Sequence, residues 1–234
     1  MNLQVEADVA AFADACARLF VERAGQAIAA RGKFVVALTG GSTPGPIHRA
    51  LATTYRDAVD WSRVTVLFGD DRAVPPTDER SNFRAANETL LAHVPATVFR
   101  IEGERTDLDR VARDYEQVLL QTCNGELDFL FVGLGQDAHV LSLWPGCPAI
   151  EERERLVVAT IDPPMNPAVS RVTMTPPVVE RAHLVLAIAT GTAKRDALSK
   201  ALHAGEDRPH IPAQILRRGR DVRWIVDAAA GAGS

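Results

Sequence analysis

The chain alternates short apolar runs with segments of helical periodicity, and this alternation restricts the fold more than any other feature. The main apolar runs, at residues 33–38, 64–68, 127–132 and 184–189, are of a length and composition typical of buried strands. Helical spacing marks the segments between them, as in residues 108–120. Strands and helices in alternation form a parallel sheet with helices on both faces. We therefore predict a single doubly wound α/β domain over residues 1–234.

Other segments add detail to this plan. Residues 156–160 and 170–175 are predicted strands joined by a proline-rich loop at residues 162–167. Because no helix lies between them, we expect them to add antiparallel strands to the mostly parallel sheet. Residues 222–226 are the last predicted strand, and the small residues 228–234 are expected to form a frayed, flexible tail.

Composition excludes several classes of protein. The net charge of −4 argues against a nucleic-acid surface. Three widely spaced cysteines without a CxxC pair argue against a disulfide framework and a zinc cluster, so we expect no metal and no cofactor. Residues 1–6 lack a signal-peptide pattern, and no apolar run could span a membrane. We expect a cytoplasmic protein without nucleic-acid or membrane partners.

A glycine-rich turn follows the first buried strand and contains Gly40, Gly41, Ser42 and Thr43. Backbone N–H groups of such a turn converge on an anion, and the following helix N-terminus adds positive potential. The turn lacks the spacing of a nucleotide P-loop or a dinucleotide fingerprint. The alternative is a tight turn with a capping hydroxyl.

Two further strand ends carry cations. Residues 184–189 run into a second glycine turn with Lys194, one of three lysines in the chain, which suits a phosphate but could also be an ordinary turn lysine. Residues 64–68 end in Asp70, Asp71 and Arg72. The arginine could hold a phosphate or carboxylate with two hydrogen bonds, or the segment could be a solvated charged loop. Ser81 or Asn82 shortly afterwards could cap a helix.

Asp137 and His139 follow the strand at residues 127–132 and the turn Gly133-Leu134-Gly135. The carboxyl edge of an open α/β sheet is where ligands bind. His139 could act as a base near neutral pH, with Asp137 close enough to orient it; the alternative is a turn histidine without chemistry. Together these loops favour a phosphorylated small molecule that reacts at its far end.

These motifs resemble those of the 6-phosphogluconolactonases, a family that shares a superfamily with the glucosamine-6-phosphate deaminases. The resemblance spans nearly the whole chain and rests on residues 38–44, 69–75 with 81–82, 133–145, 170–175, 190–195 and 212–213. It implies a Rossmann-like fold and hydrolysis of 6-phospho-D-glucono-1,5-lactone, a sugar-phosphate lactone, in the second step of the oxidative pentose phosphate pathway. It also implies a monomer or small homo-oligomer.

The resemblance also assigns roles to the loop residues. It implies that the 6-phosphate is bound by Lys194 and the first glycine turn (Gly40, Gly41, Ser42 and Thr43), and that Arg72 and Arg171 hold substrate charge and hydroxyls. His139 would be the general base that activates water. Asp137 would orient His139 or contact the sugar.

Two positions depart from the family pattern. Ala138 stands where the family usually has glycine, so a positive φ at this position would strain the turn. Asp71 stands where the family usually has glutamate.

Two other functions remain open. A glucosamine-6-phosphate deaminase would carry an acidic residue where this chain has Trp144, which cannot transfer a proton. A sugar-phosphate sensor without catalysis would carry a DNA-binding segment, whereas this chain begins with a single Ala-rich helix and is acidic.

Overall fold

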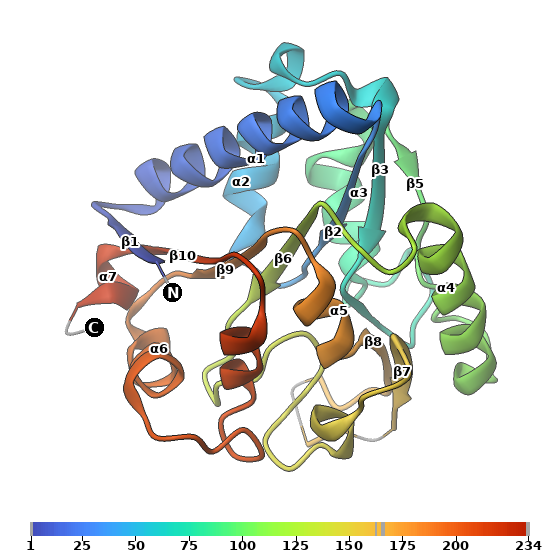
Figure 1. The fold of residues 1–234 in the computed structure, drawn as a ribbon, viewed down its shortest axis with the longest axis vertical. Helices are drawn as coiled ribbons and strands as arrows, with labels where there is room; N and C mark the ends of the chain where they lie inside the picture. Colours follow the sequence, from blue (N-terminus) through green and yellow to red (C-terminus); the bar gives the residue numbers. More distant parts are fainter. Residues whose placement is uncertain (1, 162, 165–166, 233–234) are drawn as a thin grey trace.

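A seven-stranded parallel sheet forms the centre of the fold (Figure 1). The computed structural model describes residues 2–161, 163–164 and 167–232. Along the sheet the strands follow the order β1 (Asn2–Glu6), β10 (Val222–Asp227), β9 (Val185–Ala189), β6 (Phe129–Gly133), β2 (Phe34–Leu38), β3 (Val64–Phe68) and β5 (Thr97–Val98). Every pairing in this sheet is parallel. The predicted α/β fold class is confirmed.

Helices cover both faces of the sheet. Figure 1 shows α1 and α6 on opposite sides of the sheet. The connection through α1 leads from β1 to β2, and the connection through α6 leads from β9 to β10, in the opposite direction along the sheet. Because both crossovers are right-handed, their helices lie on opposite faces. The helices are α1 (Val9–Arg31), α2 (Pro44–Ala52), α3 (Asn82–Thr89), α4 (Leu108–Cys123), α5 (Pro176–Arg181), α6 (Arg195–His203) and α7 (Ala228–Gly231). Of the helices that the structure describes, none has the length and apolar character needed to cross a bilayer.

The hydrophobic core lies on both faces of the sheet, and its aromatic part lies between α1 and the middle of the sheet. All five residues of β2 and of β9 are buried, which explains their continuous apolar sequence. Phe20 of α1 packs against Phe34, Phe129 and Phe131, with ring centroids 5.2–6.2 Å apart. Asp8 caps the start of α1, and Gly32 ends it with a φ of 75°.

The predicted antiparallel strands are present, but they form a sheet of their own. This second sheet has the order β4 (Asp70–Arg72), β8 (Arg171–Met174) and β7 (Val157–Thr160). The sequence predicted a loop for the charged residues of β4. Pairing with β8 makes this segment a strand and places Arg72 directly opposite Arg171.

Both ends of the described chain differ from expectation. Strand β1 was not predicted, and it completes one edge of the sheet by pairing with β10. The segment predicted to be a frayed tail begins with α7, in which Ala230 is fully buried and Asp227 accepts a hydrogen bond from the Ala230 N–H. Residues 233–234, like residues 162, 165 and 166 of the proline-rich segment, lie outside the described residues.

The sheet reverses its direction of growth between β2 and β6. From β2 the chain moves outward to β3 and β5, whereas β9 and β10 lie beyond β6 on the other side. Loops that leave neighbouring strands in opposite directions open a crevice at the carboxyl edge. The glycine-rich turn and the Asp137–His139 segment flank that crevice, since they follow β2 and β6 respectively.

Candidate active site

A pocket of about 190 Å³ lies at this edge of the sheet. Its walls come from the segments that follow β2, β3, β6 and β9, together with β8. The pocket brings together eight residues predicted from the sequence: Gly40, Gly41, Ser42, Thr43, Arg72, His139, Arg171 and Lys194. Asp137 is outside the wall itself and contacts His139. His210, whose place the sequence alone leaves open, is not a wall residue and is exposed.

The glycine-rich turn presents free backbone donors to the pocket. Among the described residues, no hydrogen-bond acceptor is found for the N–H groups of Gly40, Gly41 and Ser42. The Thr43 hydroxyl lies 3.3 Å from the Thr190 hydroxyl, so the glycine turns after β2 and β9 meet across the end of β6. Free N–H groups at the start of α2 suit an anion.

Lys194 lies at the start of α6, on the β9 side of the pocket. It forms no ion pair with the residues that the structure describes. Partial burial lowers the pKa of Lys194, and the charge of Asp137 partly opposes this shift. A half-buried ammonium without a paired carboxylate is available to an anionic ligand.

Arg72 and Arg171 face each other across the antiparallel pair of β4 and β8. Like charges directly opposite each other destabilise a sheet unless something compensates them. The Nε atoms of both residues are buried and have no hydrogen-bond partner among the described residues. The two guanidinium groups therefore favour an anion or another acceptor group between them.

A buried carboxylate partly compensates Arg171. Asp70 accepts a hydrogen bond from the Ser142 hydroxyl at 2.6 Å, and Arg171 Nη1 donates to the same hydroxyl at 3.4 Å. Burial lowers the pKa of Arg171, while the charge of Asp70 raises it. This small network fixes the guanidinium at the wall of the pocket.

His139 is held by Asp137 through one ring nitrogen. Asp137 Oδ1 lies 2.5 Å from His139 Nδ1 and also accepts from the His139 backbone N–H at 3.1 Å. Burial raises the pKa of Asp137. The hydrogen bond and the charge of His139 lower it by a larger amount, so the net shift of the pKa is downward. With Nδ1 occupied, Nε2 is the nitrogen that remains for a ligand or water.

The ring of His139 rests against the backbone of Gly135. A Cβ atom at residue 135 would lie 2.0 Å from His139 Nδ1, so a larger residue there would displace the ring. The glycine after β6 thus allows the base and its carboxylate partner to lie close to the strand end.

Ala138 adopts a φ of 64°, the left-handed conformation that glycine favours. The strain expected from its departure from the family pattern is therefore present. Burial of the methyl group and a hydrogen bond from the Ala213 N–H to the Ala138 carbonyl hold the turn in place.

Asp71, the second departure, has a structural role. Its carboxylate accepts hydrogen bonds from the backbone N–H groups of Arg72, Asn82 and Phe83 and from the Ser81 hydroxyl. Burial raises the pKa of Asp71, and these hydrogen bonds oppose the shift. Asp71 therefore anchors the start of α3, where Ser81 is the N-cap residue.

Sequence reasoning assigned no binding role to four other polar side chains of the wall: Thr39, Asp70, Asn82 and Thr190. Asn82 lies in the segment 81–82 that contributes to the family resemblance, but the local pattern alone indicates no more than a helix cap. The described residues contain no group of three or more His, Cys, Asp or Glu side chains arranged to hold a metal ion.

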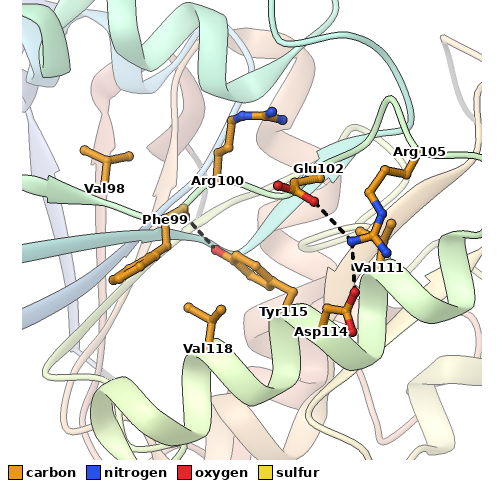
Figure 2. Close-up of a pocket in the computed structure, with 9 residues that line it drawn as sticks. All are labelled: Val98, Phe99, Arg100, Glu102, Arg105, Val111, Asp114, Tyr115 and Val118. Atoms are coloured by element: carbon orange, nitrogen blue, oxygen red, sulfur yellow. Dashed lines mark hydrogen bonds and ion pairs between the residues drawn. The ribbon is translucent and has the colours of Figure 1, made fainter.

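A larger pocket of about 410 Å³ lies at the far edge of the sheet, between β5 and α4 (Figure 2). Its charged groups are already engaged, because Arg105 contacts Glu102 and Asp114. The Tyr115 hydroxyl lies 3.3 Å from the Phe99 carbonyl oxygen. The smaller pocket holds unpaired donors and a histidine, so it is the better candidate for chemistry.

Comparisons with known proteins identify the family to which the chain belongs. A family model described as glucosamine-6-phosphate isomerases/6-phosphogluconolactonase matches residues 7–224. A 6-phosphogluconolactonase of Mycobacterium tuberculosis is 32% identical, over 93% of this chain and 92% of the relative. The solved structure of the Trypanosoma brucei 6-phosphogluconolactonase is 26% identical, with a TM-score of 0.87 over 98% of this chain and 97% of that one.

A monomeric glucosamine-6-phosphate deaminase has nearly the same fold, with a TM-score of 0.86 over 99% of both chains at 21% identity. The fold alone therefore does not distinguish the two activities. Both the family model and the curated relative cover most of the sequence, and the chain belongs to the family of glucosamine-6-phosphate isomerases and 6-phosphogluconolactonases.

Proposed function

We propose that this protein is a 6-phosphogluconolactonase, which hydrolyses 6-phospho-D-glucono-1,5-lactone to 6-phospho-D-gluconate. The observation that carries the proposal is the Asp137–His139 pair beside a pocket that also contains Lys194, Arg72 and Arg171. A base at one wall and three cations fit a substrate with a phosphate and a separate reacting carbonyl. The proposal includes the pathway step implied by the resemblance and a cytoplasmic location.

In this mechanism His139 Nε2 takes a proton from a water molecule as the water oxygen bonds to the lactone carbonyl carbon. The carbonyl oxygen becomes an oxyanion, whose charge the arginines of the pocket wall can stabilise. Collapse of the intermediate breaks the bond to the ring oxygen, which receives the proton back from His139. Asp137 keeps the imidazole in the tautomer with its proton on Nδ1.

The alternative activity is deamination of glucosamine 6-phosphate. Ring opening and aldose–ketose isomerisation need an additional proton-transferring group, and Trp144 occupies the place where that resemblance requires an acidic residue. Trp144 packs against the hydrophobic core and is absent from the pocket wall. This observation favours the lactonase.

The test follows acid release from freshly prepared 6-phosphogluconolactone and subtracts the spontaneous rate. We expect wild-type protein to exceed the spontaneous rate greatly and His139→Ala to lose about 10²- to 10⁴-fold in kcat. His183→Ala is the matched control, because His183 is exposed and precedes β9 at the opposite edge of the sheet. A fast His139→Ala variant would refute the base assignment. A wild type without activity on the lactone, but with ammonia release from glucosamine 6-phosphate, would refute the lactonase.

A further inference from the structure

Ala138, the residue before His139, is held in its left-handed conformation by a distant part of the chain. Its φ is 64°, a region that residues with a Cβ atom leave unless their surroundings hold them there. The Ala213 N–H donates to the Ala138 carbonyl oxygen at 2.9 Å. The position of the His139 ring therefore depends in part on where Ala213 lies.

The segment that leads to Ala213 makes a second contact with the same region. The Pro209 carbonyl oxygen accepts a hydrogen bond from the Gly146 N–H at 2.7 Å. Ala138 and Gly146 lie on either side of His139 in the sequence. Residues 205–213 therefore hold the polypeptide on both sides of the base, and we call them the bracing loop.

One buried side chain closes the bracing loop. Gln214 Oε1 accepts a hydrogen bond from the Asp207 N–H at 2.7 Å, and Gln214 Nε2 donates to the Gly205 carbonyl oxygen at 2.8 Å. Nε2 also lies 3.4 Å from the Ala204 carbonyl oxygen. Both ends of the amide are thus paired with the backbone of residues 204–207, just after α6. Gln214 is 1% exposed, so water does not compete for these partners.

Gln214 belongs to the same short helix as Ala213. The first turn of this 3-10 helix, η6 (Pro212–Arg218), contains the end of the bracing loop. The Gln214 side chain therefore fixes where η6 begins relative to the end of α6. Because Gln214 is absent from the pocket wall, any effect that it has on the reaction must pass through the bracing loop.

We propose that Gln214 is a positioning residue for the reaction: it keeps the bracing loop closed, and the closed loop keeps the strained Ala138 turn, and with it His139, in place. This inference rests on the proposed function, in which His139 is the base. Without the Gln214 amide, its backbone partners lose their buried hydrogen bonds and the loop can open. Ala138 can then relax toward a negative φ, which turns the peptide that carries His139.

A glycine at residue 138 would remove the need for this support. Glycine adopts a positive φ about as readily as a negative one, so Ala138→Gly keeps the turn without strain. Loss of the Gln214 amide should then have little effect on the position of His139. The two substitutions are therefore expected to be coupled in their effect on kcat.

The experiment measures kcat, KM and Tm with fresh 6-phosphogluconolactone for wild type, Gln214→Ala, Ala138→Gly and the double variant. Gln214→Ala should lower kcat about tenfold, because the base moves by a fraction of the roughly 1 Å that costs about 10²-fold. KM should stay within about threefold of wild type, because the cations of the pocket wall, Arg72, Arg171 and Lys194, lie outside the bracing loop. In the Ala138→Gly background the same substitution should lower kcat by less than about threefold.

Arg217→Ala is the matched control. Arg217 lies on the same short helix and donates to the Ala201 and Ala204 carbonyl oxygens at 2.8 and 2.9 Å, at the end of α6. Its loss removes side-chain hydrogen bonds to that region without releasing the bracing loop. It should leave kcat within about threefold of wild type in both backgrounds.

A purely structural role gives a different result. The proposal is overturned if Gln214→Ala lowers Tm but leaves kcat within about threefold of wild type, or if KM alone rises. An equal loss of kcat in the wild-type and Ala138→Gly backgrounds also overturns it.

Should Gln214→Ala fail to fold, Gln214→Met, which fills a similar volume without the amide, replaces it in both backgrounds and is judged by the same outcomes. If neither variant folds in either background, Gln214 is required for folding itself, and its role as a positioning residue is refuted. Failure of the lactonase function is distinguishable, because wild type itself would then not accelerate hydrolysis of the lactone.

Discussion

Substitution of Gly135 by alanine should separate the catalytic geometry from the stability of the fold. The added Cβ would lie 2.0 Å from His139 Nδ1, whereas ordinary van der Waals contact begins near 3.4 Å. The imidazole must therefore retreat by about 1.4 Å or rotate, since the strand end behind Gly135 is part of the sheet. The backbone at residue 135 does not have a positive φ, so alanine itself fits the backbone conformation.

The displacement acts mainly on the reaction. Moving the ring breaks the 2.5 Å contact between Nδ1 and Asp137 and shifts Nε2 by a similar distance. A misplacement of about 1 Å can cost about 10²-fold in rate, so kcat/KM for the lactone should fall by roughly that factor. Stability should change by less than about 1 kcal/mol, because the His139 side chain is partly exposed and can move without opening the core.

The assay measures kcat/KM with fresh lactone alongside thermal unfolding of the same preparations. Gly205→Ala is the control, because a Cβ at residue 205 has no neighbour within 4 Å and its φ is not positive. If Gly135→Ala keeps kcat/KM within about threefold of wild type while Tm is unchanged, the position of the His139 ring is not what the reaction requires.

Two further predictions concern the anchor of α3 and the charge of Lys194. Asp71→Ala should lower the free energy of unfolding by about 2–4 kcal/mol in urea titrations, because three backbone N–H groups lose their acceptor. Asp71→Ser keeps a short acceptor and should therefore lower the free energy of unfolding by less. Equal losses for the two variants would contradict the capping role. Burial lowers the pKa of Lys194, so this side chain loses its positive charge at a lower pH than an ordinary lysine does. The affinity for 6-phosphogluconate, measured by calorimetry, should therefore decline as the pH rises toward the lowered pKa of Lys194. Lys194→Arg should remove this decline, because arginine keeps its charge. If the affinity of Lys194→Arg depends on pH as that of wild type does, Lys194 does not bind the phosphate.

The buried strands and most helices could be predicted because their signals are local. Helix α4 contains the predicted helical segment 108–120, and β3 spans the predicted residues 64–68. Apolar runs and helical spacing indicate which side chains are buried, and both patterns can be recognised within one continuous stretch of sequence. The same holds for the polar loops, since parallel strands bring their carboxyl ends to one edge wherever they lie in the chain.

The elements that escaped prediction depend on distant partners. Strand β1 has the sequence NLQVE with mostly exposed side chains, and its partner β10 begins more than two hundred residues later. The charged segment Asp70–Arg72 becomes a strand only through pairing with β8. Asn82 shows the same limit at the site, because its contacts with Gly40 and Asp70 are not revealed by any spacing along the sequence.

The pairing of β1 with β10 also has a kinetic consequence. Asn2 is aligned with Arg223, so β1 cannot pair until β10, more than two hundred residues later in the chain, has been synthesised. Contacts between residues so far apart slow folding, because a long loop must close before the pairing stabilises it. Before β10 is available, β1 is an unpaired segment. Its short and largely polar sequence disfavours pairing with strands of other chains.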